Sequence, residues 1–213
     1  MVVNPAVRWP ERTKRVLDVA LAAGLLVLTC PVTALAATAI RLETPGPVLF
    51  CQERVGRNGR RFQIYKLRTM AVDNDDSEHR AYVAALMQGQ ADRRGGVFKL
   101  VADRRVTRVG RLLRRLSIDE LPQLLNVLRG DMSMVGPRPP LPSEAELYDT
   151  RARQRLAVKP GITGLWQVSG RCLLSYQEMI ALDLQYCRSS SVATDLGILL
   201  RTPASVLSRR GAA

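Results

Sequence analysis

Two adjacent carboxylates in an arginine-rich region are the residues of this sequence best suited to chemistry. Asp119 and Glu120, called the dyad below, follow a run of arginines at positions 105, 108, 111, 114 and 115. The segment Gly136 to Pro140 comes soon after, is rich in proline and holds Arg138. Carboxylates bind divalent cations, and guanidinium groups bind phosphates. This combination therefore predicts a site for a phosphorylated substrate and a divalent cation.

The dyad is expected at the start of a helix. Ser117 and Glu120 have the spacing of a capping box, in which both side chains bind backbone N–H groups of the first turn. Leucines at helical spacing follow at positions 121, 124, 125 and 128, and Pro122 falls where a missing N–H costs least. Acidic residues favour helix N-termini by about 0.3 to 1 kcal/mol without any catalytic role, so capping alone is an alternative explanation of the dyad.

Two other motifs allow competing interpretations. Asp73-Asn74-Asp75 has the DxD form with which many glycosyltransferases hold a metal, and such an enzyme would transfer a sugar without its phosphate. The motif lies in an acidic run without a preceding strand, which favours a solvated loop. Lys159 to Arg171, KPGITGLWQVSGR, combines glycine and proline around Trp166 and predicts a rigid loop rather than part of the core.

The composition limits the classes of partner. Lys and Arg number 32 against 19 Asp and Glu, and the net charge of +13 predicts an anionic partner such as nucleic acid, a phosphorylated substrate or acidic lipid. Aromatic residues make up only 5%, which is few for a surface that stacks bases and argues against nucleic acid. The cysteines form no CxxC pair and His79 is the one histidine, which argues against a zinc site and favours a reducing, cytoplasmic compartment. A basic membrane-anchored binding protein without chemistry is the alternative from another class, and the dyad argues against it.

An apolar segment near the N-terminus is long enough to cross a bilayer. Val19 to Ile40 contains no charged residue, and its 22 residues form about 33 Å of helix at about 1.5 Å per residue. Pro31 lies near the middle, where it removes a backbone donor and predicts a break. Both flanks are basic, which favours a re-entrant helix-hairpin with both flanks in the cytoplasm. A kinked transmembrane helix and a cleaved signal peptide are the alternatives.

Two further regions complete the expected organisation. Pro47 to Met70 contains two short apolar or alternating runs around Asn58-Gly59, the strongest short signal for a β-hairpin. Asp195 to Arg210 mixes leucine and arginine, which suits either a helix on an anionic membrane surface or packing on the domain. We therefore expect an α+β, mainly helical fold in three parts. These are a re-entrant membrane anchor over 1–42, a cytoplasmic catalytic domain over 43–190 and an amphipathic membrane-surface segment over 191–213.

Four motifs give the sequence a resemblance to a known family. KRVLDVALAAG, RNGRRFQIYKLRTM, SIDELPQLLNVLRGDMSMVGPRP and KPGITGLWQVSGR, in this order and spacing, resemble the bacterial sugar transferases, which are monotopic phosphoglycosyl transferases. The resemblance covers roughly residues 14 to 207. It implies transfer of a sugar 1-phosphate from a UDP-sugar to a polyprenyl phosphate, usually undecaprenyl phosphate, with release of UMP. It further implies a re-entrant helix around Pro31, the cytoplasmic face of the bacterial inner membrane, and the first step of exopolysaccharide, capsule or O-antigen synthesis.

The resemblance also implies roles for individual residues. Asp119 is implied to be the nucleophile, which forms an aspartyl phospho-sugar intermediate, and a ligand of Mg²⁺ or, alternatively, Mn²⁺. Glu120 is implied to support the acceptor half-reaction or to orient the site. The implied phosphate or uridine diphosphate contacts are Arg114, Arg138 and Arg171, with Lys66 and Arg68 lining the same site and Lys14 and Arg15 meeting the lipid phosphate. Galactose or glucose is favoured over acetamido sugars, membrane lipids are further partners, nucleic acid is not expected, and a homodimer is left open.

Overall fold

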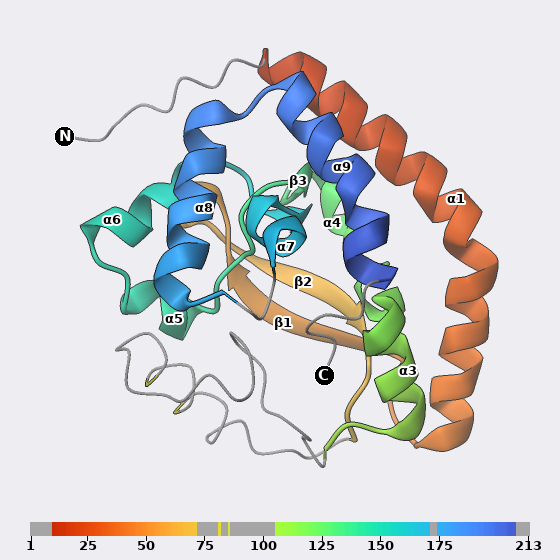
Figure 1. Cartoon of the computed structure of the whole chain (residues 1–213). Helices are drawn as coiled ribbons and strands as arrows, with labels where there is room; N and C mark the ends of the chain where they lie inside the picture. The colour runs from red at the N-terminus through yellow and green to blue at the C-terminus, as the bar shows by residue number, and fades with distance from the viewer. Residues whose placement is uncertain (1–9, 72–80, 82–84, 86–104, 171–173, 208–213) are drawn as a thin grey trace.

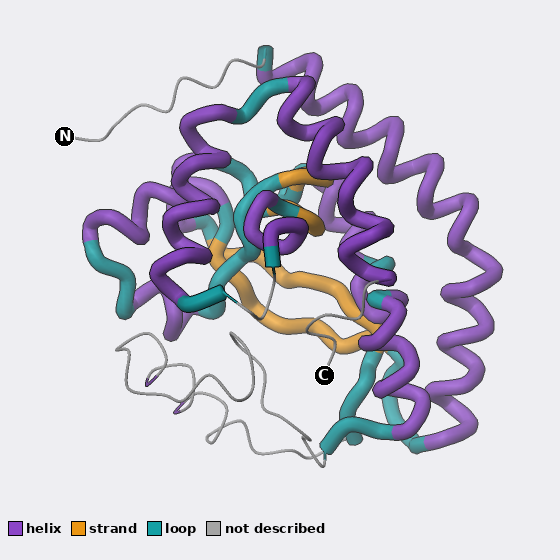
Figure 2. Tube along the Cα trace, viewed as in Figure 1, coloured by secondary structure: helices purple, strands orange, loops and turns teal. Residues whose placement is uncertain are grey.

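The computed structural model describes residues 10–71, 81, 85, 105–170 and 174–207. These residues form mostly helices and two small sheets, which confirms the predicted α+β, mainly helical class. Figure 2 shows the strands in the centre of the molecule with helices around them. The described elements, labelled in part in Figure 1, are α1 (Glu11–Glu43), β1 (Leu49–Val55), η1 (Arg57–Gly59), β2 (Arg61–Leu67), α3 (Arg108–Leu116), η3 (Ile118–Glu120), α4 (Gln123–Arg129), β3 (Ser133–Val135), α5 (Pro142–Glu146), α6 (Thr150–Arg153), η4 (Gln154–Ala157), β4 (Gly161–Thr163), α7 (Leu165–Ser169), α8 (Tyr176–Ser189) and α9 (Val192–Leu207).

The predicted β-hairpin is confirmed. β1 and β2 pair antiparallel, with Leu49 opposite Leu67 at the open end. The turn places Asn58 at φ 57° and Gly59 at φ 81°, in the left-handed region that asparagine and glycine tolerate best. The Asn-Gly pair therefore sets the turn, and the turn sets the register of the two strands.

One buried side chain docks this hairpin on α4. The amide oxygen of Asn126 accepts a hydrogen bond from Tyr65 N at 3.1 Å, and its nitrogen donates to Gln63 O at 2.7 Å. Beside this contact, Ile64 of β2 packs with Leu124 of α4 in the central apolar cluster. The strand that carries Lys66 is thereby fixed relative to the helix that follows the dyad.

β3 and β4 form a parallel pair that joins two motifs distant in sequence. Ser133 lies opposite Gly161, and Gly136 N donates to Thr163 O at 2.9 Å. The backbones approach so closely that a Cβ on Gly161 would lie 2.0 Å from Gly136 N. Only glycine allows this contact without displacement of the backbone.

The rigid loop expected over Lys159 to Arg171 is therefore wrong for most of its length. Gly161–Thr163 is a strand, and Leu165–Ser169 is a short helix. Trp166 of this helix is buried among Met179 and Ile180 of α8, in an apolar cluster of the core. Gly161 and Gly164 of this motif serve close packing, whereas Gly170 ends the short helix with φ 148°.

α1 is one curved helix that continues through Pro31 (Figure 1). The break expected at this residue is not observed. A proline removes one backbone hydrogen bond of a helix and commonly bends it without ending it when the turns on both sides are intact. Hydroxyls on both sides of the proline bond back to the helix, Thr29 to Leu25 O at 2.7 Å and Thr33 to Thr29 O at 2.9 Å.

The N-terminal end of α1 is bound to the globular part by charged groups. Lys14 pairs with Asp195 of α9 at 2.5 Å. Asp18 accepts hydrogen bonds from the Ser133 hydroxyl and from Met134 N, both at 3.0 Å. Because Asp18 is buried, these bonds fix the start of the helix against β3.

The C-terminal end of α1 is bound to the same globular part. The carboxylate of Glu43 accepts hydrogen bonds from Arg108 N at 2.7 Å and Val109 N at 3.0 Å, at the start of α3. Between the two ends the helix exposes large apolar side chains, such as Val27 at 78% and Leu28 at 74%. By length and composition α1 could cross a membrane, and its apolar middle indicates membrane association.

α9 packs on the domain with one face and exposes apolar residues on the other. Ile198 belongs to the central apolar cluster, whereas Leu196, Leu200 and Leu207 are exposed. α3 lies near α9 on the same side of the molecule (Figure 1) and likewise exposes Leu112. Packing on the domain, one of the two expectations for this segment, is confirmed, and contact of its outer face with a membrane stays a prediction.

Candidate active site

The dyad lies in η3, a single turn of 3-10 helix between α3 and α4, and not in the first turn of α4. Ser117 has a left-handed backbone with φ 56°, and its side chain makes no capping hydrogen bond within the described chain. Its N–H instead bonds to Arg114 O at 3.2 Å and completes α3. The predicted capping box is therefore wrong, because this residue ends one helix and α4 begins only at Gln123.

Glu120 is held by groups from two elements. Its Oε1 pairs with Lys66 Nζ of β2 at 2.7 Å, and its Oε2 accepts a hydrogen bond from the amide of Gln123. Both carboxylate oxygens thus have donors, which fixes the direction of the side chain. Asp119 beside it is only 8% exposed, so the dyad lies in a partly closed environment.

Arg114 lies on α3, close to the end of β2. Its Nε donates to the hydroxyl of Thr69 at 2.9 Å. α3 approaches the backbone of Thr69 so closely that a Cβ on Gly110 would lie 2.1 Å from Thr69 O. The KLRTM segment is therefore fixed against the helix that leads into the dyad.

Three other predicted binding residues make structural contacts. Arg68 donates to Pro45 O at 2.5 Å and Thr44 O at 2.9 Å, and so holds the segment after α1. Arg15 donates to two carbonyls at the end of α4, at 2.5 and 2.7 Å, where a cation complements the helix dipole. Lys14 pairs with Asp195, as described above. Substrate or lipid binding by these three residues stays a prediction, and Arg171 lies outside the described residues.

Arg138 lies on the loop Gly136–Pro140, called the proline loop below, and pairs with a buried carboxylate. Its Nη1 lies 3.0 Å from Oε2 of Glu144, which also accepts a hydrogen bond from Leu141 N at 3.0 Å. Burial alone would raise the pKa of Glu144, but the charges of Arg138 and Arg54 outweigh it and lower this pKa. The carboxylate is thus held ionised as the counter-ion of the loop arginine.

Arg54 of β1 belongs to the same cluster and was not identified from the sequence. It is 8% exposed and donates to Pro139 O at 3.3 Å. Burial and the charge of Arg138 lower the pKa of Arg54 to about 10, while Glu144 and Glu120 act in the opposite direction. The side chain is therefore within electrostatic reach of both the proline loop and the dyad. The run Gln52-Glu53-Arg54 is polar on both faces of the strand, so alternation along the sequence gives no sign of this burial.

The carboxylates of the dyad are groups that would hold a magnesium ion together with substrate phosphates. Among the described residues no group of three or more His, Cys, Asp and Glu is placed to hold a metal. Mg²⁺ commonly takes one or two carboxylates and completes its shell with water and substrate phosphates. Asp119, beside a Glu120 already bound by Lys66, matches that donor set.

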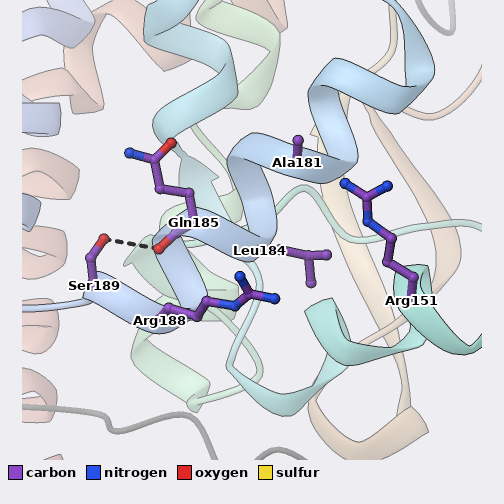
Figure 3. A pocket seen from close by; sticks show the side chains of 6 residues that line it. All are labelled: Arg151, Ala181, Leu184, Gln185, Arg188 and Ser189. Atoms are coloured by element: carbon purple, nitrogen blue, oxygen red, sulfur yellow. Dashed lines mark hydrogen bonds between the residues drawn. The ribbon is translucent and has the colours of Figure 1, made fainter.

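A shallow cavity of about 350 Å³ lies apart from these residues, between α6 and α8 (Figure 3). Its lining consists of Arg151, Ala181, Leu184, Gln185, Arg188 and Ser189. None of the predicted site residues that the structure describes borders it, and the candidate active site is therefore assigned to the dyad and its surroundings instead.

The chain is similar to several bacterial proteins. It is 47% identical over 202 residues to the UDP-glucose:undecaprenyl-phosphate glucose-1-phosphate transferase of Caulobacter vibrioides, with 91% of this chain and 69% of that protein covered. It is 44% identical over 200 residues to the exopolysaccharide production protein ExoY of Rhizobium meliloti, with 92% and 86% covered. It is also 44% identical over 201 residues to the galactosyl transferase CpsE of Streptococcus agalactiae serotype III, of which it spans only 43%.

The family match extends over almost the whole chain. A family model described as bacterial sugar transferase matches residues 9–209. This range includes the dyad, the proline loop and both ends of α1. The chain belongs to the bacterial sugar transferase family.

Proposed function

We propose that this protein transfers a hexose 1-phosphate from a UDP-sugar to undecaprenyl phosphate and releases UMP, as the first step of exopolysaccharide, capsule or O-antigen synthesis. The observation that carries the proposal is the dyad, with Asp119 largely buried and Glu120 fixed by Lys66 at 2.7 Å. The names of the relatives, a glucose-1-phosphate transferase and a galactosyl transferase, support a hexose as the sugar.

In the first half-reaction a carboxylate oxygen of Asp119 attacks the phosphorus next to the sugar. The bond from this phosphorus to the bridging oxygen breaks, and its electron pair leaves with UMP. The product is an aspartyl phospho-sugar. The attack brings a carboxylate to an anionic diphosphate, so cations are needed to offset the repulsion, and we assign this role to Arg138 and Arg114.

In the second half-reaction a phosphate oxygen of undecaprenyl phosphate attacks the same phosphorus, and the Asp119 carboxylate leaves. Glu120 orients the site during this step, because Lys66 and Gln123 already hold both of its oxygens. Asp119 would hold Mg²⁺, which when bound supplies positive charge to the diphosphate oxygens.

We further propose that α1 enters and leaves the bilayer on the cytoplasmic side. Both ends of this helix bind the same globular part, Lys14 to Asp195 and Glu43 to Arg108 N. A helix that spanned the membrane would place its ends in different compartments and break one of these contacts. Its exposed apolar middle would lie in one leaflet, with the outer leucines of α9 at the surface.

Cys30, Cys51 and Cys187 are free thiols, which suits the reducing cytoplasm.

Intact-mass measurement tests the covalent mechanism. The wild type is incubated with Mg²⁺ and UDP-glucose or UDP-galactose, without lipid acceptor. We expect a mass increase of one hexose phosphate and one equivalent of UMP. Asp119→Asn should give neither, since a neutral amide cannot replace the nucleophile, whereas the control Asp131→Asn should react normally. Release of UDP, or a normal adduct on Asp119→Asn, would contradict the mechanism.

Removal of the metal tests the role assigned to Mg²⁺. Excess EDTA should stop UMP release, and added Mg²⁺ should restore it. Undiminished release in EDTA would exclude the metal from the reaction.

A further inference from the structure

The proline loop is held at each of four consecutive carbonyl groups. Three of its residues are prolines, which have no backbone N–H to donate. The donors all come from other segments of the chain: Gly161 N to Pro137 O at 2.9 Å, Arg155 Nη2 to Arg138 O at 3.1 Å, Arg54 Nη1 to Pro139 O at 3.3 Å and Val55 N to Pro140 O at 2.9 Å. A loop bonded at every residue has little freedom to change its backbone conformation.

Two of these four donors are buried arginine side chains. Arg155 is only 2% exposed, forms an ion pair with Asp183 of α8, and donates to the hydroxyl of Tyr148 at 2.7 Å. Arg54 is 8% exposed and also donates to Gln52 Oε1 at 2.6 Å. Burial of a guanidinium is unfavourable unless partners compensate it. Surface carbonyls could bond to water instead, so satisfying these carbonyls does not by itself require two buried cations.

The two arginines bind two consecutive carbonyls, that of the loop's one charged residue and that of the residue after it. Arg155 binds the carbonyl of Arg138 itself, and Arg54 binds the carbonyl of the next residue, Pro139. The guanidinium of Arg138 is held at its other end by Glu144 at 3.0 Å. The backbone and the side chain of Arg138 are therefore both fixed before any ligand binds.

We propose that Arg54 and Arg155 are positioning residues that act through Arg138 and align its guanidinium for the diphosphate of the donor. This inference rests on the proposed function in that Arg138 contacts the donor diphosphate. Arg54 comes from the hairpin and Arg155 from the segment before β4. Together they tie the loop to the hairpin and to η4. Neither arginine needs to touch the substrate in this arrangement.

The lysine variants should fail to replace these arginines. The guanidinium of Arg155 contacts Asp183, Tyr148 and the Arg138 carbonyl at once. The ammonium of a lysine lacks the planar fork of donors and cannot bind all three. A displacement of about 1 Å at a reacting group can cost about 100-fold in rate. Arg54→Lys and Arg155→Lys should therefore slow UMP release strongly, and the displaced Arg138 should also weaken UDP binding, although the net charge is unchanged.

A double-mutant cycle on UDP binding tests the proposal. The dissociation constant of UDP is measured in Mg²⁺ for full-length wild type, Arg54→Gln, Arg138→Ala and the double variant. We expect Arg54→Gln to weaken binding at least tenfold in the wild-type background and less than twofold in the Arg138→Ala background. Equal factors in both backgrounds, or no effect of Arg54→Gln, would overturn the proposal. The same cycle is run with Arg155→Lys.

Controls separate this role from folding and from the proposed reaction. Arg61→Gln changes an exposed arginine on the same hairpin and should leave UDP binding unchanged. Thermal unfolding in detergent identifies a variant that fails to fold, in which case Arg54→Lys replaces Arg54→Gln in the cycle and Arg155→Gln replaces Arg155→Lys. Tyr148→Phe removes one partner of Arg155 but leaves its bond to the loop. UDP binding should therefore change less than twofold, and a tenfold loss would contradict the assignment.

UDP binding needs no turnover, so a wild type that binds UDP but forms no aspartyl adduct would refute the proposed function alone.

Discussion

The two sides of the candidate site are held in different ways. The proline loop is fixed through its backbone, with a donor on every carbonyl from residue 137 to residue 140. Within the described chain the backbone bonds of the dyad turn are local, such as Glu120 N to Ser117 O at 3.3 Å, and the side chains of Lys66 and Gln123 fix the carboxylate of Glu120. Backbone bonds set the position of a group within fractions of an ångström, whereas a side-chain ion pair tolerates a shift of its partner. We therefore expect activity to be lost when the backbone of the proline loop is displaced. At the dyad, we expect activity to depend on the charge of the partner of Glu120.

The largest expected effect is at the glycine contact behind the loop. A Cβ on Gly161 would lie 2.0 Å from Gly136 N, so Gly161→Ala must displace backbone. We expect a loss of about 3 kcal/mol in stability and of at least 100-fold in activity. Gly197→Ala on α9 is the control, because nothing lies within 4 Å of its Cβ. Thermal unfolding and UMP release measure both, and normal activity in Gly161→Ala would show that the loop is not held rigidly.

The next effect tests the dependence of the dyad on charge. Lys66→Met removes the cation on Glu120 and should lower kcat/KM for UMP release by about 10- to 100-fold, since the carboxylate loses a charged hydrogen-bond partner. Lys66→Arg should recover most of the activity, in contrast to Arg54→Lys on the loop side. If Lys66→Arg were as impaired as Lys66→Met, the difference proposed between the two sides would be wrong. Arg60→Gln, an exposed hairpin residue, serves as the control.

A smaller effect is expected at the counter-ion of Arg138. Glu144 has a pKa below its ordinary value of 4.5, so its contribution to stability is complete above that value and is lost as the pH falls through the lowered pKa. Glu144→Gln should reduce stability by about 2 kcal/mol at pH 7. It should also make the unfolding midpoint less sensitive to acid. Unfolding at pH 3 to 7 measures this, and an unchanged acid dependence would show that this carboxylate is not the titrating group.

The smallest effect concerns the residue between α3 and the dyad. Ser117 has φ 56°, a conformation that disfavours residues with a Cβ by roughly 1 kcal/mol. Ser117→Gly should therefore raise stability by about 1 kcal/mol, and Ser117→Ala should leave it nearly unchanged. A loss of about 1 kcal/mol in Ser117→Ala would instead indicate a capping role for the hydroxyl.

The sequence predicts those elements whose hydrogen bonds join residues close together in the chain. The hairpin depends on Asn58-Gly59, which sets the turn, and the apolar length of α1 is visible in the sequence. The start of α4 was misplaced because the backbone of Ser117 completes the preceding helix. The strand Gly161–Thr163 was missed because its partner lies at Ser133–Val135, and parallel pairing leaves no short-range pattern.

Residues that act through distant partners could not be found in this way. Arg54 binds a carbonyl 85 residues away, and Arg155 binds one 17 residues away. Arg68 lies in the same KLRTM segment as Lys66, yet its guanidinium binds Thr44 and Pro45 while Lys66 meets the dyad. Motif membership thus identifies the neighbourhood of a site, and only the fold separates the groups that face it from the groups that support it.

The ion pair between Lys14 and Asp195 has a consequence for biosynthesis. Its partners are 181 residues apart, so the contact cannot form until almost the whole chain has left the ribosome. The apolar middle of α1 is exposed even in the folded chain, so lipid can accept it before this contact forms. Membrane contact should therefore precede completion of the catalytic domain during synthesis. A stalled chain that ends before α9 should already sediment with membranes, although it cannot close this contact.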